Sequence, residues 1–244
     1  MPDIANVGVN SVAAIALSMQ NKEVARLEAS SFNLANVDNA GFKAMMVLPQ
    51  AVTYKKAGSP DISYVRATHI SRDISPGSFK PTGDPLHLYV QGKGYFGIQT
   101  PDGERYTRDG RFTRNEQGLL SDMRGNAVGG GISIPSNVAL VDIRKNGDVY
   151  ADGNLIGQIP LYTFPNEENS LANVGHGLYR ANQPGEAVDN PNIRSGGYEE
   201  SNVQAIKEMA ELSDIMRKYE LAQKLASMEE AKQRKAINIS TTGK

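Results

Sequence analysis

The 244-residue chain contains no cysteine, no long apolar run and no excess of charge of one sign. Without cysteine, disulfides, thiolate metal sites and cysteine nucleophiles are excluded. A net charge of -1 gives no electrostatic footprint for nucleic acid or for an anionic membrane. No segment reaches the roughly 18 apolar residues of a membrane span, and the first residues lack the basic region and cleavage site of a secretory signal. We expect any export of this protein to proceed without a cleaved signal.

Helix breakers are almost absent from the C-terminal part of the chain. After Gly197 there is no proline, and the only further glycine is Gly243. Ser201 with Gln204 three residues later has the form of a capping box, which satisfies two free N–H groups at a helix start. The sequence therefore predicts one helix over 202–236, which at about 1.5 Å per residue would be roughly 50 Å long.

The apolar residues of this helix fall on at least two faces, whereas an amphipathic surface helix has a single apolar stripe. A helix that is apolar on several sides needs several neighbours, and we infer that other copies or other subunits supply them. An alternative is a C-terminal helix packed only on its own domain. The two faces are Leu212, Ile215, Tyr219 and Ala226 on one side, and Val203, Ile206, Leu221, Leu225 and Met228 nearer the other.

A second helix is predicted over 10–39, where residues spaced alternately by four and three form a seam of the coiled-coil kind. Gly41 follows as a candidate left-handed C-cap with Phe42 as its hydrophobic contact. Because the two helices lie at opposite ends of the sequence, we expect them to pair across the segment between them. The seam residues are Ala13, Leu17, Gln20, Val24, Leu27, Ser31 and Leu34.

The middle of the chain differs from both ends. Residues 44–83 hold four prolines and short alternating pieces, which indicates an extended connector. Residues 84–196 form short alternating runs separated by Asp-Gly and Asn-Gly turns, the signature of antiparallel hairpins. The predicted fold class is α+β: long, paired, coiled-coil-like helices in 1–43 and 197–244 form a core domain, and the connector and an antiparallel β domain are inserted between them.

A search for chemistry gives no catalytic, cofactor or metal site. Residues 92–97 match the dinucleotide fingerprint, but a strand-like run follows where the fingerprint needs a helix. Residues 148–159 lack the ligands of a calcium loop, and His69, His87 and His176 have no second ligand at metal spacing. Paired carboxylates of a glycan-cleaving site can always be imagined across a β domain, yet solvated turns explain the acidic residues better.

Four arginines recur at every third residue through two predicted hairpin arms. They offer either a cationic contact surface for a neighbouring subunit or an anionic polymer, or a solvated edge that protects an exposed strand by charge. We favour the solvated edge slightly. The residues are Arg105, Arg108, Arg111 and Arg114.

Ordered motifs give a more specific signal. They are Asn33–Asn36 (NLAN) with Gly41–Lys43 (GFK), Gly92–Phe96 (GKGYF), Tyr106–Phe112 (YTRDGRF) and Glu200–Val203 (ESNV). In this order and over nearly the whole chain, they resemble the signatures of the flagellar rod and hook protein family.

Two positions depart from the family pattern, Phe32 and Asn39, and they affect only local contacts after the first helix. The length and the segment 129–135 (GGGISIP) are more similar to the proximal rod members than to the distal rod or the longer hook members. A distal rod paralogue is the nearer alternative, and a secreted β domain that binds or cleaves glycan is the alternative from another class.

The resemblance implies a structural, non-enzymatic subunit that polymerises through its terminal helices into the flagellar drive shaft. It implies other rod proteins as partners, with copies of itself as a further candidate, and passage through the type III export apparatus to the periplasmic part of the basal body. The implied assembly interface comprises Leu17, Val24, Leu27, Asn33, Leu34, Ala35, Asn36, Gly41, Phe42, Ser201, Asn202, Val203, Leu212, Ile215, Met216, Tyr219, Leu221 and Leu225.

Overall fold

The computed structural model describes the backbone of residues 4–54 and 62–242. The parts of the predicted helical segments and connector that fall on residues 1–3, 55–61 and 243–244 lie outside the described residues. The chain divides into two compact units. Unit 1 contains the residues up to 35, residues 45–71 and the residues from 204 onward, and unit 2 contains residues 36–44 and 72–203.

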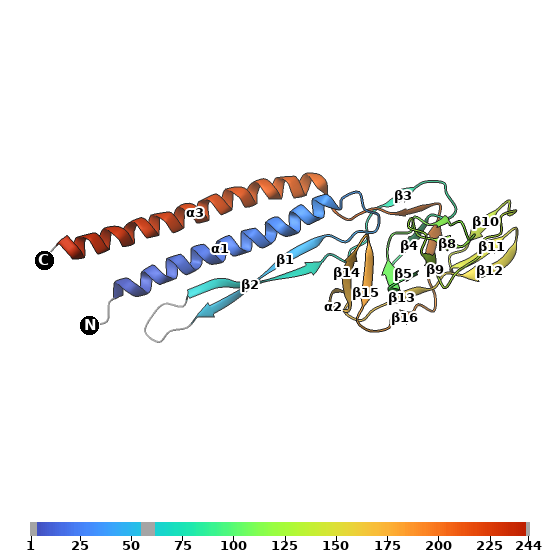
Figure 1. Ribbon diagram of the computed structural model, residues 1–244, viewed down its shortest axis with the longest axis horizontal. Coiled ribbons are helices and arrows are strands. Elements are labelled where there is room, and N and C mark those ends of the chain that lie inside the picture. Colours follow the sequence, from blue (N-terminus) through green and yellow to red (C-terminus); the bar gives the residue numbers. More distant parts are fainter. Residues whose placement is uncertain (1–3, 55–61, 243–244) are drawn as a thin grey trace. The chain divides into compact units, whose positions relative to one another are not determined.

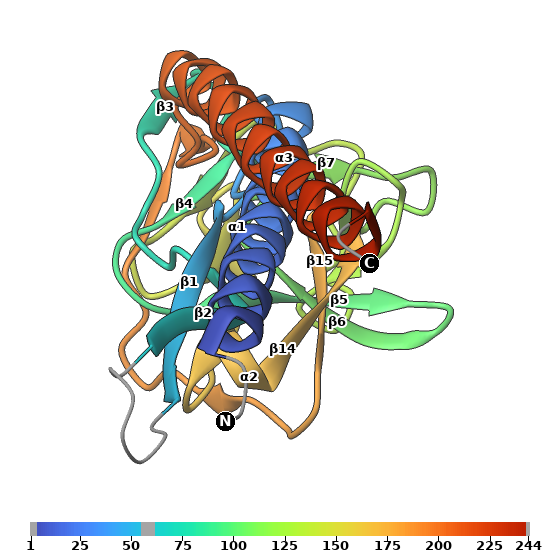
Figure 2. The same cartoon turned by 90° about the vertical axis from the view of Figure 1, so that its left-hand side faces the viewer.

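Unit 1 consists of two helices and a two-stranded sheet. Helix α1 spans Ile4–Ala35 and helix α3 spans Ala205–Thr242, while strands β1 (Met45–Tyr54) and β2 (Ile62–Arg72) pair with each other. Figures 1 and 2 show α1 and α3 running side by side in opposite directions, with α1 between α3 and the β1–β2 sheet. Among the described residues, no helix is both long and apolar enough to cross a membrane.

The start of α3 lies three residues beyond the predicted position. Ser201 Oγ accepts the N–H of Val203 at 3.2 Å, which closes a short turn rather than a capping box. The first α-helical hydrogen bond runs from the N–H of Glu208 to the carbonyl of Gln204, at 3.0 Å. The capping-box prediction is therefore wrong, because the Ser201 hydroxyl is used by the turn before the helix.

The predicted C-cap at Gly41 is also wrong, since α1 ends at Ala35. Gly41 instead occupies a tight turn in which the N–H of Phe42 donates to the carbonyl of Asn39 at 3.1 Å. Its φ of +66° lies in the left-handed region that favours glycine. A Cβ on Gly41 would collide with the backbone of Arg108, so a close approach between two segments of unit 2 also requires glycine here.

The segment predicted as an extended connector, 44–83, is extended in backbone conformation but paired. It contains β1 and β2 and then β3 (Phe79–Pro81), which pairs with β18 (Gly197–Glu199). Ladder hydrogen bonds thus satisfy backbone groups that a free connector would leave to water.

The remaining elements belong to unit 2 and are short. They are β4 (Leu88–Val90), β5 (Tyr95–Thr100), β6 (Gly103–Thr107), β7 (Thr113–Arg114), β8 (Leu120–Ser121), β9 (Ala127–Val128), β10 (Val141–Ile143), β11 (Asp148–Ala151), β12 (Asn154–Gln158), β13 (Leu161–Thr163), α2 (Glu167–Ser170), β14 (Leu171–Gly175), β15 (Leu178–Ala181), β16 (Glu186–Ala187), β17 (Ile193–Ser195) and β18.

Antiparallel pairing dominates unit 2, which confirms the α+β class. One sheet has the strand order β14-β15-β6-β5-β9-β8-β7, with β13 joining β5 and β16; β10-β11-β12 form another, and β17 pairs with β4. The main core lies between these sheets and includes Leu88, Phe96, Phe112, Val149 and Ile159, each at most 1% exposed. A smaller aromatic cluster is formed by Tyr95, Tyr106, Phe164, Leu171 and Tyr179.

Turn signals in the sequence are mostly, but not always, hairpins. Residues 101–103, 146–147 and 152–153 do join paired strands. Asp109-Gly110 does not, because β6 pairs with β5 and β15 while β7 pairs with β8. At Gly110 the carbonyl accepts the N–H of Leu88 at 2.8 Å, and a Cβ would run into the Leu88 backbone. Glycine is needed at this position because two backbone segments cross too closely for a Cβ to fit.

The fingerprint-like segment 92–97 has the structure of a strand entry. Gly92 and Gly94 have φ of +108° and +130°, and β5 begins directly after them at Tyr95. No helix N-terminus follows that could receive a pyrophosphate. The expectation that this segment is not a dinucleotide site is therefore consistent with the local fold.

Candidate assembly surfaces and the buried polar joint

Polar side chains join α1 to α3 within unit 1. The hydroxyl of Ser30 donates to Glu208 Oε2 at 2.5 Å, and the guanidinium of Arg26 donates to Glu211 Oε1 at 2.7 Å. Burial lowers the pKa of Arg26, but the hydrogen bond to Glu211 and the charge of Glu23 outweigh it, so its pKa is raised. The bridges fix the register of the two helices where their described side chains meet.

Asn33 ties α1 to the first strand as well. Its Oδ1 accepts the N–H of Met45 at 2.7 Å, and its Nδ2 donates to the Met45 carbonyl at 2.9 Å. Nδ2 also lies 3.2 Å from Glu208 Oε1. Asn33 is 2% exposed, so a buried side-chain amide acts here like the backbone of a neighbouring strand.

Three buried positions on each helix are spaced by seven residues, and those on α1 are not the predicted seam; Ala29 and Asn33 are buried as well. Small and polar residues fill much of this register; Ser30 is held by Glu208, and Glu23 forms an ion pair with Arg26 at 2.8 Å. The coiled-coil seam predicted from the apolar heptad is thus not the contact found inside the chain. The buried residues of the repeat are Ala16, Glu23 and Ser30 on α1, and Ile215, Ala222 and Glu229 on α3.

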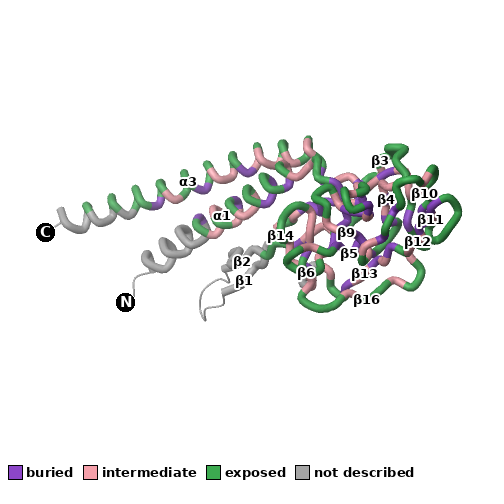
Figure 3. The backbone as a smooth tube through the Cα atoms, turned by 45° about the vertical axis from the view of Figure 1, so that its right-hand side comes forward, coloured by how far each residue is buried: buried purple, intermediate pink, exposed green. Residues whose placement is uncertain are grey.

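Large apolar side chains on both helices are exposed. On α1 the predicted seam residues Leu17, Val24 and Leu27 are 39–58% exposed, and on α3 Leu221 and Met216 are 57% and 62% exposed. Figure 3 shows exposed positions recurring along the described length of both helices. Exposed apolar residues that gather on one element mark a site for a partner, whereas single scattered ones need no explanation. Those of α1 and α3 belong to the first kind, because several lie on each helix.

The other predicted interface residues divide between exposed, intermediate and buried positions. Leu225 and Ala35 are exposed. Leu34, Asn36, Leu212, Tyr219, Ser201 and Asn202 are intermediate. Asn33, Gly41, Phe42, Val203 and Ile215 are buried inside their own units, and Ala13, from the seam, has a side chain outside the described set.

Unit 2 contains a buried polar joint, which we define as Lys43, Glu199, Arg108 and Asn202. Lys43 Nζ donates to Glu199 Oε1 at 2.6 Å and to the carbonyl of Ser75 at 2.8 Å. Glu199 and Lys43 have side chains only 1% and 2% exposed. The pair connects the segment that follows α1 in the sequence with the strand that precedes α3.

Arg108 is the second cation of the joint. Its Nη1 lies 3.7 Å from Glu199 Oε2, and its Nη2 donates to the carbonyl of Gly92 at 2.5 Å. The guanidinium carbon lies 5.3 Å from the centre of the Tyr95 ring. Burial lowers the pKa of Lys43, and the positive charge of Arg108 adds to this, while Glu199 opposes it. Two buried cations therefore depend on one carboxylate.

Neither interpretation of the four arginines holds for Arg108, which is 5% exposed. Arg111 forms a two-pronged ion pair with Asp109 at 2.9 and 2.7 Å, and Arg114 Nε donates to the carbonyl of Ile134 at 2.7 Å. The guanidinium of Arg105 contacts carbonyls of its own turn. Each arginine has a different local partner, so they do not form one cationic surface.

Asn202 closes the joint. Its Oδ1 accepts the N–H of Ala44 at 2.7 Å, and its Nδ2 donates to the carbonyl of Asp73 at 2.9 Å. Nearby, the apolar side chains of Phe42, Ala44 and Val203 pack together. Asn202 therefore holds three segments of unit 2 together, a role that its predicted position in a helix would not have allowed.

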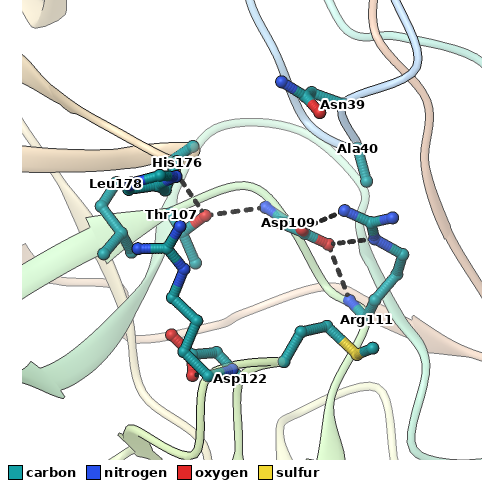
Figure 4. Close-up of a pocket in the computed structure, with 11 residues that line it drawn as sticks. Asn39, Ala40, Thr107, Asp109, Arg111, Asp122, His176 and Leu178 are labelled. Carbon is teal, nitrogen blue, oxygen red and sulfur yellow. Dashed lines mark hydrogen bonds and ion pairs between the residues drawn. The ribbon is translucent and has the colours of Figure 1, made fainter. Parts of the chain in front are cut away.

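A pocket of about 200 Å³ lies beside the turn that carries Asn39 (Figure 4). Within it, the Thr107 hydroxyl donates to the Gly177 carbonyl at 2.7 Å, and Asp109 faces Arg111. Asp122 accepts backbone N–H groups of its own turn. Both carboxylates are thus engaged in structural contacts. Among the described residues, no group of three or more His, Asp and Glu could hold a metal ion.

Comparison with known proteins identifies the family. The flagellar hook protein FlgE/F/G D1 domain matches residues 89–151, and the flagellar basal body rod FlgEFG protein C-terminal family matches residues 194–239. The flagellar basal-body rod protein FlgF of Caulobacter vibrioides is 34% identical over 221 residues, which cover 86% of this chain and 90% of that protein. This chain belongs to the flagellar basal-body rod protein family.

Two further relatives agree. The FlgF protein of Mesorhizobium japonicum is 31% identical over 84% of this chain and 88% of its own length. The FlgG protein of Caulobacter vibrioides is 33% identical over 82% of this chain and 88% of its own length. The chain is most like FlgF, and the FlgG-like alternative is no better supported.

As a rod family member, the protein is a structural, non-enzymatic subunit of the flagellar basal body that interacts with other rod and flagellar components. The glycan-cleaving alternative is therefore set aside. Sequence reasoning missed Lys43, Arg108 and Glu199 as a unit, although the first two lie inside the rod family motifs. The signal that was available is the presence of one cation, Lys43, in the GFK motif, of Arg108 in the YTRDGRF motif, and of a glutamate, Glu199, directly before the ESNV motif.

Proposed function

We propose that this rod subunit polymerises through the exposed faces of α1 and α3 into the drive shaft that transmits torque from motor to hook. The observation that carries the proposal is the exposure of Leu17, Val24 and Leu27 on α1 and of Leu221 and Leu225 on α3. In the rod, these heptad positions would pack against helices of neighbouring subunits in a coiled-coil-like manner. Full burial of a leucine contributes about 1.5 to 3 kcal/mol, and because these side chains are about half exposed, covering the rest of one would contribute roughly half of that.

The same proposal assigns a role to each part of the sequence. Segments 1–43 and 197–244 form the core domain that builds the shaft, 44–83 connects, and 84–196 is the β domain that lies outside the shaft. Three residues of the polar joint, Lys43, Glu199 and Asn202, lie in the segments that follow α1 and precede α3 in the sequence, whereas Arg108 lies in the β domain.

We further propose that the neighbours are other rod proteins and copies of this chain, at the proximal end of the periplasmic part of the rod. The subunit would reach this place unfolded, through the flagellar type III export apparatus and without a cleaved signal. The absence of cysteine supports this route, since no disulfide has to form after export.

The test replaces exposed leucines by aspartate, in the variants Leu17→Asp and Leu221→Asp. We expect each purified variant to keep the circular dichroism of the wild type, because these side chains are exposed in the single chain. In a strain that lacks the native gene, we expect loss of swimming and loss of the protein from isolated basal bodies, since a carboxylate would be buried without a partner.

The matched control is Leu155→Asp, which changes a similarly exposed leucine of β12. It should keep swimming and incorporation. Normal incorporation of both helix variants into basal bodies would refute assembly through these faces. Loss of incorporation in all three variants would refute the special role of the helices.

A further inference from the structure

A second candidate contact surface lies in unit 2, in a groove of about 600 Å³. Its floor contains the buried residues Ile143 and Ile193, which are 4% and 1% exposed. Its rim carries three cations and two polar side chains, and no carboxylate is among the described residues that line it. The rim residues are Arg144, Lys145 and Arg194, with Gln91 and Ser195.

Two of the cations are held in place by aromatic rings. The guanidinium carbon of Arg194 lies 3.8 Å from the centre of the Phe79 ring, and that of Arg144 lies 3.9 Å from the centre of the Tyr150 ring. Phe79 is itself supported by an edge contact with Tyr89, at 5.4 Å between ring centres. Stacking on a ring restricts a guanidinium group and leaves its N–H edge available for a carboxylate.

The cations of this groove are poorly neutralised by the chain itself. Arg144 approaches Asp142 at 3.7 Å, but both side chains are more than half exposed, and such pairs contribute little. Within the part of the chain that the structure describes, no carboxylate forms an ion pair with Lys145 or Arg194. The groove therefore concentrates positive charge that the described carboxylates of the chain neutralise only weakly.

The surrounding sequence has the opposite charge balance. Residues 84–196 contain thirteen Asp and Glu against ten Lys and Arg, so the segment as a whole is acidic, whereas the charged residues that line the groove are all cations. A second copy of the same chain consequently offers many carboxylates that could enter the groove. Complementary potentials of this kind steer association and fix register.

We propose that this groove binds a carboxylate-bearing surface of a second copy of this chain, which gives the β domain a contact of its own, distinct from the helix faces. The contact does not depend on α1 or α3. It joins adjacent subunits through charge, whereas the helix faces join them through apolar burial, and the two contacts respond to salt in opposite ways.

The test uses zero-length carbodiimide cross-linking of full-length protein, with unlabelled and ¹⁵N-labelled chains mixed in equal amounts at low salt. This reagent joins a lysine amine to a carboxylate in contact with it. We expect Lys145 in peptides that combine light and heavy chains, and a loss of these peptides at high salt. Cross-links of Lys145 confined to single chains, or none at Lys145 while other lysines react between chains, would overturn the proposal.

A variant provides a second measurement, by sedimentation velocity. Lys145→Glu should weaken the salt-sensitive self-association at least about tenfold in Kd, equivalent to about 1.4 kcal/mol. The matched control, Arg180→Glu, makes the same charge change at an exposed position of β15 and should leave Kd unchanged. Equal weakening by both variants would show a general charge effect and overturn the proposal. Association that persists at high salt reports on the helix faces, so failure of either contact can be recognised separately.

Discussion

Replacing Glu199 by glutamine tests whether the polar joint depends on one carboxylate. Glutamine keeps the shape of the side chain and can still accept the N–H of Gly77, which now reaches Glu199 Oε1 at 2.9 Å. The charge is lost, however, and Lys43 and Arg108 remain buried without the carboxylate that pairs with both of them. Glu199→Gln therefore isolates the electrostatic contribution.

The expected cost is large because both cations are almost fully covered. Removing one partner of a buried ion pair typically destabilises a protein by about 3 to 5 kcal/mol. The ordinary net value of a hydrogen bond, about 1 kcal/mol, would apply if solvent reached the site. With side chains 1–4% exposed for all three residues, we expect Glu199→Gln to fall in the higher range.

The assay is urea unfolding of unit 2, followed by near-ultraviolet circular dichroism of its buried tyrosines. Lys43→Met serves as the comparison, since it removes one cation and leaves Glu199 with Arg108. We expect it to cost less than Glu199→Gln, and the double variant to cost less than the sum of both by about 0.5 to 3 kcal/mol. A loss below about 1 kcal/mol for Glu199→Gln, or simple additivity, would refute the argument that one carboxylate neutralises two buried cations.

Three other perturbations follow from the described contacts. Gly41→Ala should destabilise unit 2 by about 1 to 3 kcal/mol or more, because alanine would have a strained φ and its Cβ would collide with Arg108. Gly83→Ala is the control in the same urea assay, and it should cost less because the space around Gly83 is open. Asn33→Ala should cost roughly 2 to 4 kcal/mol and speed amide exchange in α1 and β1, since it leaves two backbone groups unpaired. Burial raises the pKa of Tyr106 to about 12, whereas an unfolded tyrosine ionises near 10. The free energy of unfolding should therefore fall as the pH rises from about 10 to about 12. Tyr106→Phe should reduce this loss, which an alkaline titration followed by tyrosinate absorbance measures.

The two helices could be predicted because the relevant information is local. Seven-residue repeats and missing helix breakers are properties of neighbouring residues, and α1 and α3 appear where those patterns lie. Their ends were harder to place. Ser201 and Gly41 each have the local form of a cap, but Ser201 closes a turn of its own and Gly41 is required by the close passage of Arg108.

The polar joint could not be predicted from local pattern, since its members are far apart in the sequence. Lys43 and Glu199 are separated by 156 positions, and Arg108 lies between them. A charged residue in a turn-rich segment is usually solvated, so the arginine spacing favoured an exposed edge. Only the fold brings the three groups together and removes them from water.

The residues of the family motifs and those of the apolar helix faces contribute to different properties, namely the stability of the single subunit and its assembly. Motif residues such as Asn33, Lys43 and Asn202 are satisfied by partners within their own units, through the hydrogen bonds of the single chain. Leu17 and Leu221 have no comparable cover in the described chain. Substitutions in the motifs should consequently reduce the stability of the isolated subunit, whereas substitutions on the faces should leave the subunit folded and reduce incorporation. Under the proposed function, a subunit that passes through export unfolded and then assembles would need both properties, and the separation places them on different residues.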